Sequence, residues 1–184
     1  MRKSPPVLPE VKLTRVLRLA RADSIAIIAC AGASLLLSVA GQSWVFAGFS
    51  ALAVLTGAME WHGQEKLRQR DIGGLHWIIG AQGCLYTIVL GYVLWRWRHF
   101  DPNAYWAEIP APARDQLLAQ MSEAGLDPEA DRELLLRTMN FVLCLVLFGV
   151  SSLYQGGLAL WYRFQQEAVF AALESPSTAG ADER

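Results

Sequence analysis

Four long apolar stretches constrain the fold of this chain more than any other feature. They cover residues 24–41, 44–59, 72–95 and 141–161, and none of them contains Asp, Glu, Lys or Arg. A bilayer core requires about 20 predominantly apolar residues per helical span, whereas a water-soluble bundle carries a polar stripe along each helix. The sequence therefore predicts an all-α integral membrane protein: a four-helix bundle with short amphipathic helices outside the spans.

The charged residues lie between these stretches, and their sign differs from one segment to the next. The chain before the first span and the loop at residues 61–71 are basic, whereas residues 99–136 are rich in Asp and Glu. Basic short loops stay in the cytoplasm. We therefore expect a multi-pass protein of the cell (inner) membrane with both termini cytoplasmic (N-in/C-in). Interfaces favour amphipathic rings, so an inner aromatic belt is expected at Trp61, Trp77, Trp161 and Tyr162.

This orientation divides the chain into successive segments. We expect a cytoplasmic basic segment at 1–23, spans at 24–41, 43–61 and 72–95, an outward-facing helical segment at 96–137, a fourth span at 138–163, and a cytoplasmic helical extension with a disordered tail at 164–184. Residues 1–9 contain three prolines and are expected to be extended or disordered. Residues 11–22 have one apolar face, which predicts either a helix on the membrane surface or an extension of the first span.

Short connections are expected between the first three spans. Gly41, Gln42 and Ser43 predict a tight turn, so the first two spans should form an antiparallel hairpin. Asp71 is a candidate N-cap for the third span. The basic region before the first span is long, and we therefore expect that span to be retained rather than removed as a signal peptide.

The outward-facing segment has helical patterns of its own. Residues 113–124 are amphipathic, and Asp127 followed by Pro128 predicts the start of a helix that continues into the fourth span. The apolar side of the first pattern offers a patch for a partner, formed by Leu117, Leu118 and Met121.

Small residues recur at helical spacing on the third and fourth spans. Such residues allow helices to approach closely in lipid, so we expect these faces to pack together or against another subunit. Two adjacent glycines within a span indicate either a contact site or a kink. The predicted packing or oligomer face comprises Gly73, His76, Gly80, Gly83 and Thr87 on the third span, and Gly149, Ser152, Gly156 and Gly157 on the fourth.

Several polar side chains should lie in the cytoplasmic half of the membrane, and Gln82 should lie near the middle. Polar groups at this depth usually face the bundle interior or water, which predicts a polar vestibule open to the cytoplasm. The alternative is a set of satisfied hydrogen bonds between helices. The candidate residues are Glu60, His62, His76, Gln82, Tyr154 and Gln155.

The sequence lacks the patterns typical of cofactor or catalytic sites. Haem ligation by His62 and His76 ranks below the interpretations above, because His62 borders charged residues and no His-x-x-x-His spacing occurs. The three cysteines lie inside different spans and suit small apolar packing. Glu60 and His62 do not share a helix face. We therefore predict no cofactor and no metal, and we assign no catalytic residue.

Two classes of function fit these features, and an enzyme, which would rest only on Glu60, His62 and His76, ranks third. The first is a non-catalytic subunit, assembly factor or self-associating scaffold, favoured by the small-residue faces. The second is an oligomeric channel or small transporter, for which Gln82, Thr87 and Gln155 are candidates for a polar lining. The expected partners are the lipid bilayer and either further copies of the chain or another membrane protein. Nucleic acid is excluded as a partner because the basic stretch is short and adjacent to the membrane.

Overall fold

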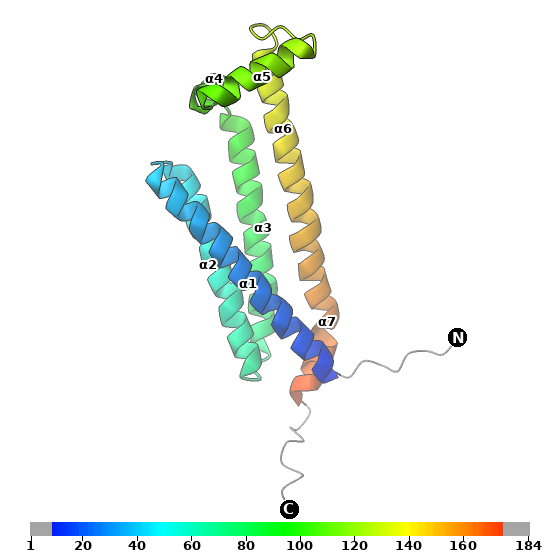
Figure 1. Ribbon diagram of the computed structural model, residues 1–184. Coiled ribbons are helices and arrows are strands. Elements are labelled where there is room, and N and C mark those ends of the chain that lie inside the picture. Colours follow the sequence, from blue (N-terminus) through cyan, green and yellow to red (C-terminus); the bar gives the residue numbers. More distant parts are fainter. Residues whose placement is uncertain (1–8, 175–184) are drawn as a thin grey trace, which may run out of the picture. The chain divides into compact units, whose positions relative to one another are not determined.

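A computed structural model describes residues 9–174, and the regular structure of this part is helical throughout. The expectations for residues 1–8 and for the tail at 175–184 lie outside the described residues. The helices are α1 (Pro9–Ala40), α2 (Trp44–Arg68), α3 (Gly73–His99), α4 (Pro102–Glu108), α5 (Ala111–Glu123), α6 (Arg132–Ser151), the π-helical turn η1 (Ser152–Gly156) and α7 (Gly157–Glu174). Figure 1 labels the seven α-helices of this part of the chain.

Four helical stretches are long and apolar enough to cross a membrane. They are α1, α2, α3 and the continuous stretch formed by α6, η1 and α7, with mean hydropathies between 1.3 and 2.0 over their most apolar windows. Large apolar side chains remain on their surfaces, including Leu37 at 74% and Leu153 at 81% exposure. A water-soluble monomer rarely exposes so much apolar surface. These helices are those of a multi-pass membrane protein, and the all-α prediction is confirmed.

The chain forms two compact units. Within the described residues, the first comprises residues 9–88 and 152–174, and the second comprises residues 89–151. α1, α2, η1, α7 and the first part of α3 therefore belong to the first unit. The last part of α3 belongs to the second unit together with α4, α5 and α6.

In the first unit, α1 and α2 form an antiparallel hairpin, which Figure 1 shows as two helices side by side. The turn between them is closed by a hydrogen bond from the Ser43 amide to the Ser38 carbonyl at 2.8 Å. Within the turn, Gln42 has a left-handed φ of 55°. Along the hairpin, Gly57 lies against Ile28, where an added Cβ would come within 2.7 Å of the Ile28 side chain. The tight turn and hairpin expected from the sequence are confirmed.

α1 continues without a break from Pro9 to Ala40. Of the two interpretations of residues 11–22, the structure therefore has the helical extension of the first span. Within this extension, Val16 and Ala20 are fully buried and pack in a core with Tyr162 and Val169 of α7. An uninterrupted helix is physically reasonable because residues 10–40 contain neither proline nor a pair of adjacent glycines.

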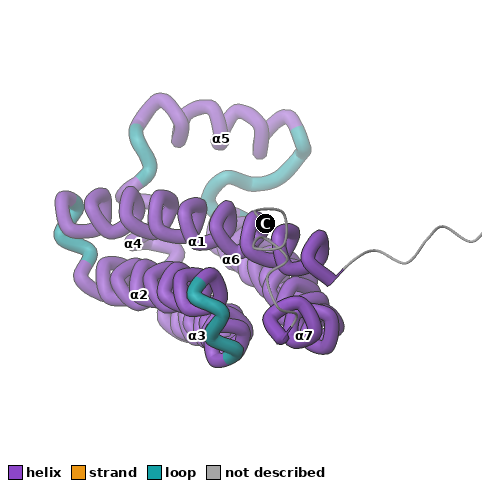
Figure 2. Tube along the Cα trace, turned by 90° about the horizontal axis from the view of Figure 1, so that it is seen from below, coloured by secondary structure: helices purple, strands orange, loops and turns teal. Residues whose placement is uncertain are grey.

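α2 and α3 approach each other closely at two glycines next to their short connection, drawn in teal in Figure 2. An added Cβ on Gly63 would lie 2.8 Å from the Gly74 carbonyl oxygen, so only hydrogen atoms fit between the two backbones. The side chain of Asp71 accepts a hydrogen bond from the Gly73 amide at 2.8 Å. The predicted N-cap of the third span is therefore present.

The second unit carries the two short helices α4 and α5. Asp101 caps α4 by accepting a hydrogen bond from the Asn103 amide, with Pro102 at the first helical position. On α5, Met121 is buried while Leu117 and Leu118 are half-buried. α6 begins at Arg132, later than the sequence indicated. The Asp127 side chain caps a turn at residues 128–131 instead, by accepting from the Glu129 amide at 2.8 Å.

Candidate functional site

Three polar side chains from three different spans are buried inside the first unit. Asp23 on α1 is 5% exposed, Gln82 on α3 is 1% exposed and Glu60 on α2 is fully buried. Gln82 lies nine residues after the start of α3, which corresponds to about 13 Å along the helix. Burying polar groups among apolar helices is costly unless they are paired, so their hydrogen bonds decide what the site can do.

Asp23 is the best-satisfied member of the cluster. One carboxylate oxygen, Oδ2, accepts a hydrogen bond from the Gln82 Nε2 amide at 2.7 Å. The other, Oδ1, accepts a hydrogen bond from the Tyr154 hydroxyl at 2.7 Å. Both bonds are short, as expected for donors to an ionised carboxylate. The arrangement therefore suits the charged form of Asp23.

Glu60 lies next to Asp23 but is poorly satisfied. It interacts electrostatically with Asp23 and is close to Gln82. Its Oε1 atom accepts a long hydrogen bond of 3.5 Å from the Tyr162 hydroxyl. Its Oε2 atom is buried without a hydrogen-bond partner, and so is Oε1 of Gln82. The ion pairs Lys66–Asp71 and Arg68–Glu65 at the nearby end of α2 involve neither buried carboxyl group. The cluster therefore combines two orphaned oxygens with two adjacent acids.

The π-helical turn η1 supplies the tyrosine that bonds Asp23. Such turns are rare and often occur at functional sites. Within η1, the hydroxyl groups of Ser152 and Tyr86 lie 3.0 Å apart, and Gln155 is buried. η1 ends at Gly156 and α7 begins at Gly157, so this helical irregularity lies where the adjacent glycines indicated a kink or a contact site. Both glycines face open space.

The structure brings together only some of the residues predicted for the polar vestibule. Glu60, Gln82 and Tyr154 meet at Asp23, and Gln155 is buried in the same turn as Tyr154. His62 and His76 are both exposed, and the His62 ring packs edge-on against Trp77 at 5.4 Å. The two histidines are therefore not members of the cluster.

Two members of the site, Asp23 and Tyr162, do not follow from the sequence patterns that predict the vestibule. Asp23 was assigned to the cytoplasmic basic segment because it precedes the first apolar stretch by one residue. It nevertheless shares the buried face of α1 with Val16, Ala20 and Ser24, and this helical spacing was visible in the sequence. Tyr162 was expected in an interfacial belt, but it is fully buried. No local pattern distinguishes a buried tyrosine from an interfacial one near the end of a span.

Most of the predicted small-residue face lies open within the chain. Added Cβ atoms on Gly80, Gly83, Gly149, Gly156 and Gly157 would meet nothing within 4 Å. His76 and Thr87 are exposed. Gly73 is close only to the capping side chain of Asp71. Packing of this face against another subunit therefore remains a prediction, while Gly57, Gly63 and Gly74 make the close helix contacts inside the first unit.

Within residues 9–174, no group of three His, Cys, Asp or Glu side chains is arranged to hold a metal ion. The chain matches no protein-family model, no curated protein and no solved structure. The chemistry of the buried cluster is therefore the guide to function.

Proposed function

We propose that this protein is a small proton-translocating or proton-coupled membrane component, in which Glu60 takes up and releases a proton beside Asp23. The observation that carries the proposal is the orphaned Oε2 atom of fully buried Glu60, next to a second carboxyl group. Ionisable residues inside membrane spans are expensive to bury and commonly serve proton relays or ion pathways.

Hydrogen bonding favours a state in which the two acids carry one proton between them, bound to Glu60. Two ionised carboxylates side by side in an apolar bundle would each carry a desolvation penalty of several kcal/mol. Asp23 has two strong donors that suit its charged form. A proton on Oε2 of Glu60 would neutralise the second acid, and donation of that proton to Oε1 of Gln82 would satisfy both orphaned oxygens.

Tyr154 offers the cluster a connection to the surface. Its side chain is 53% exposed, while its hydroxyl group bonds Asp23. A hydroxyl group both donates and accepts hydrogen bonds. If water reaches its exposed side, Tyr154 can accept a proton from that water as it releases its own to Asp23, and the proton then passes to neighbouring Glu60. The location of this tyrosine in a π-helical turn favours a functional role, because a regular helix forms more favourable backbone hydrogen bonds.

The donor set favours a proton over a bound cation. A hard cation takes about six or more oxygen ligands. In the cluster, both oxygens of Asp23 already accept hydrogen bonds, and the two tyrosine hydroxyls act as donors to the carboxyl groups. Only two orphaned oxygens remain.

Infrared spectroscopy of the protein in lipid nanodiscs tests whether Glu60 carries the proton. We expect the carbonyl band of a protonated carboxyl group in the wild type and its loss in Glu60→Gln. The matched control is Glu65→Gln, which removes an exposed carboxylate from the same helix, where it pairs with Arg68 at 3.7 Å. A band that persists in Glu60→Gln would assign the proton to another residue and overturn the proposal.

Translocation is tested separately with vesicles that enclose a pH-sensitive dye and carry an imposed membrane potential. We expect proton entry with the wild type and with Glu65→Gln, and none with Glu60→Gln or Asp23→Asn. If vesicles with the wild type show no proton entry, the protein does not translocate protons in the absence of a co-substrate. Equal flux in wild type and Glu60→Gln would reject the cluster as the route.

A second candidate function is that of a self-associating subunit or scaffold. It is favoured by the open space beside Gly80 and Gly83 on an apolar span, because small residues allow close contact between subunits in lipid. This role is compatible with proton translocation, since four spans enclose little of a pathway unless subunits associate. We retain the inner membrane and cytoplasmic termini as part of this proposal.

A further inference from the structure

A groove on the second unit has the chemistry of an amphiphile. It runs between the end of α3 and the first half of α6 and consists of two adjoining hollows of about 320 and 180 Å³. The two hollows share the rings of Trp97 and Phe141, so they form one continuous depression. Neither hollow contributes to the buried acid cluster.

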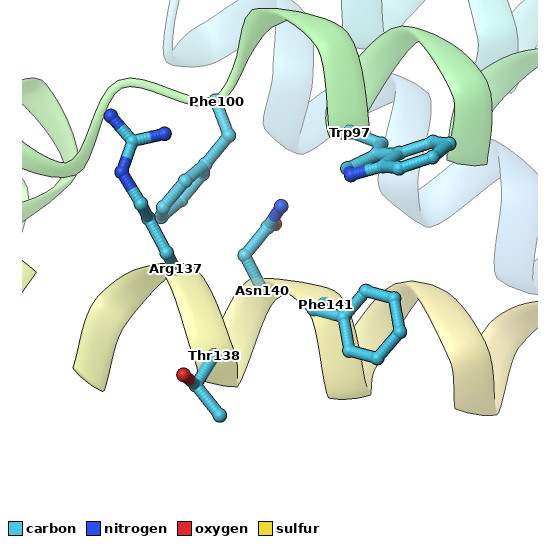
Figure 3. Close-up of a pocket in the computed structure, with 6 residues that line it drawn as sticks. All are labelled: Trp97, Phe100, Arg137, Thr138, Asn140 and Phe141. Atoms are coloured by element: carbon cyan, nitrogen blue, oxygen red, sulfur yellow. The ribbon is translucent and has the colours of Figure 1, made fainter. Parts of the chain in front are cut away.

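One end of the groove is polar and basic. Arg137 and Asn140 of α6 reach toward Phe100 at the end of α3, as Figure 3 shows. Arg96 lies beside this end, where its Nε donates to Oδ1 of Asn140 at 2.8 Å and its guanidinium lies over the Phe100 ring. Two guanidinium groups thus flank a polar hollow that contains an amide side chain.

The acidic neighbour of this end is weakly held. Glu133 pairs with Arg137 at 2.8 Å, one turn apart on α6, and both side chains are exposed. An exposed pair of this kind contributes little, so the Arg137 guanidinium is free to exchange its partner for a more strongly charged anion. Phosphate oxygens suit such an exchange because guanidinium groups bind them in a bidentate manner.

The other end of the groove is wholly apolar. On α6 it runs for about 10 Å from Phe141 to Phe148, so the whole groove from Arg137 to Phe148 is about 16 Å long, estimated from the helical rise. Most of its side chains are exposed despite their size. The apolar hollow is lined by Val93, Leu94, Trp97, Phe141, Cys144, Leu145 and Phe148.

We propose that this groove binds one anionic phospholipid, with its phosphate at Arg96 and Arg137 and one acyl chain along the apolar hollow. Charge complementarity selects the head group, because basic pockets between membrane helices attract anionic lipids. Continuity with the apolar hollow selects a lipid over free phosphate, which would leave that hollow unfilled.

Native mass spectrometry in detergent, together with thermal melting in the presence of added lipid, tests the proposal. We expect phosphatidylglycerol to remain bound and to raise the melting temperature, whereas phosphatidylcholine and inorganic phosphate have little effect. Arg137→Gln and Arg96→Gln should each weaken phosphatidylglycerol binding about fivefold, since one basic residue near a lipid surface is lost. Arg98→Gln is the matched control, because Arg98 is exposed on α3 and does not line the groove.

A second variant distinguishes the contribution of the acyl chain to binding from that of the head group. Leu145→Trp fills the apolar hollow and leaves both arginines in place, so it should also weaken lipid binding while the unliganded protein melts near the wild-type temperature. Equal binding of phosphatidylcholine and phosphatidylglycerol would overturn the proposal. Stabilisation by inorganic phosphate alone would show that the groove is a simple anion site and not a lipid site. Equal losses of phosphatidylglycerol binding in Arg98→Gln and Arg137→Gln would show that the lipid responds only to non-specific surface charge.

Discussion

Replacing Gly74 by Ala should destabilise the contact between α2 and α3 by a predictable amount. The new Cβ would collide with the Gly63 carbonyl oxygen and would lie 2.6 Å from the Leu67 amide nitrogen. Both neighbours are backbone atoms, so the strain is relieved only if a whole helix shifts. Overpacking of this kind costs about 3 kcal/mol at its upper range, and the greater helix propensity of Ala recovers about 1 kcal/mol. The net expectation is a loss of about 2 kcal/mol.

Tryptophan fluorescence during thermal melting measures this loss in detergent or nanodiscs. For a chain of this size, about 2 kcal/mol corresponds to a decrease in melting temperature of about 4–8 °C. The matched control is Gly48→Ala on α2, where an added Cβ meets nothing within 4 Å. Because no collision occurs there, only the greater helix propensity of Ala matters. The free energy of unfolding should stay unchanged or rise by about 0.5–1 kcal/mol.

Gly80→Ala extends the comparison to the predicted oligomer face. In the isolated chain its Cβ meets open space, as in Gly48→Ala. If subunits pack closely on this face, Gly80→Ala will lower the melting temperature or shift the oligomer to monomer in gel filtration, whereas Gly48→Ala will not. A Gly74→Ala protein as stable as the wild type would refute the close approach of α2 and α3.

Two further predictions concern single side chains. Tyr154→Phe removes a donor to a carboxylate and should lower the free energy of unfolding by about 1.5–3 kcal/mol. In the same melting assay, Tyr86→Phe removes only the hydroxyl contact to Ser152 and should lower it by about 0.5–1.5 kcal/mol. Equal losses of stability would contradict a charged Asp23. A lipid-soluble thiol reagent followed by mass spectrometry should modify exposed Cys30 and Cys84 faster than buried Cys144, and a reversed order would contradict the packing of α6.

Much of the fold was predictable because hydrophobic length determines which segments cross a bilayer. The four spans, the turn at Gln42 and the cap at Asp71 all depend on local sequence, and each is present in the structure. The later start of α6 was not predictable in the same way. Asp127 has the chemistry of a helix cap, but the turn that it caps ends before α6 begins.

The site was only partly predictable because it depends on contacts between distant segments. Polar groups in spans turn away from lipid, and this argument places Glu60, Gln82 and Tyr154 in one predicted vestibule; in the structure these three side chains lie around Asp23. Depth does not indicate which face each side chain occupies, and His62 and His76 accordingly lie on exposed faces. Asp23 lies just outside the first apolar stretch, so hydropathy does not place it in the span, although α1 continues across that boundary.

The hydrogen bond between Tyr154 and Asp23 joins residues that are 131 positions apart. A nascent chain therefore inserts its first acid into the bilayer long before the matching hydroxyl leaves the ribosome. During that interval Asp23 has at most the Gln82 amide from the third helix, and Glu60 lacks Tyr162. Entry of the last helical stretch brings the Tyr154 and Tyr162 hydroxyls and completes the polar cluster, so a chain truncated before residue 152 lacks these donors to its two costly acids.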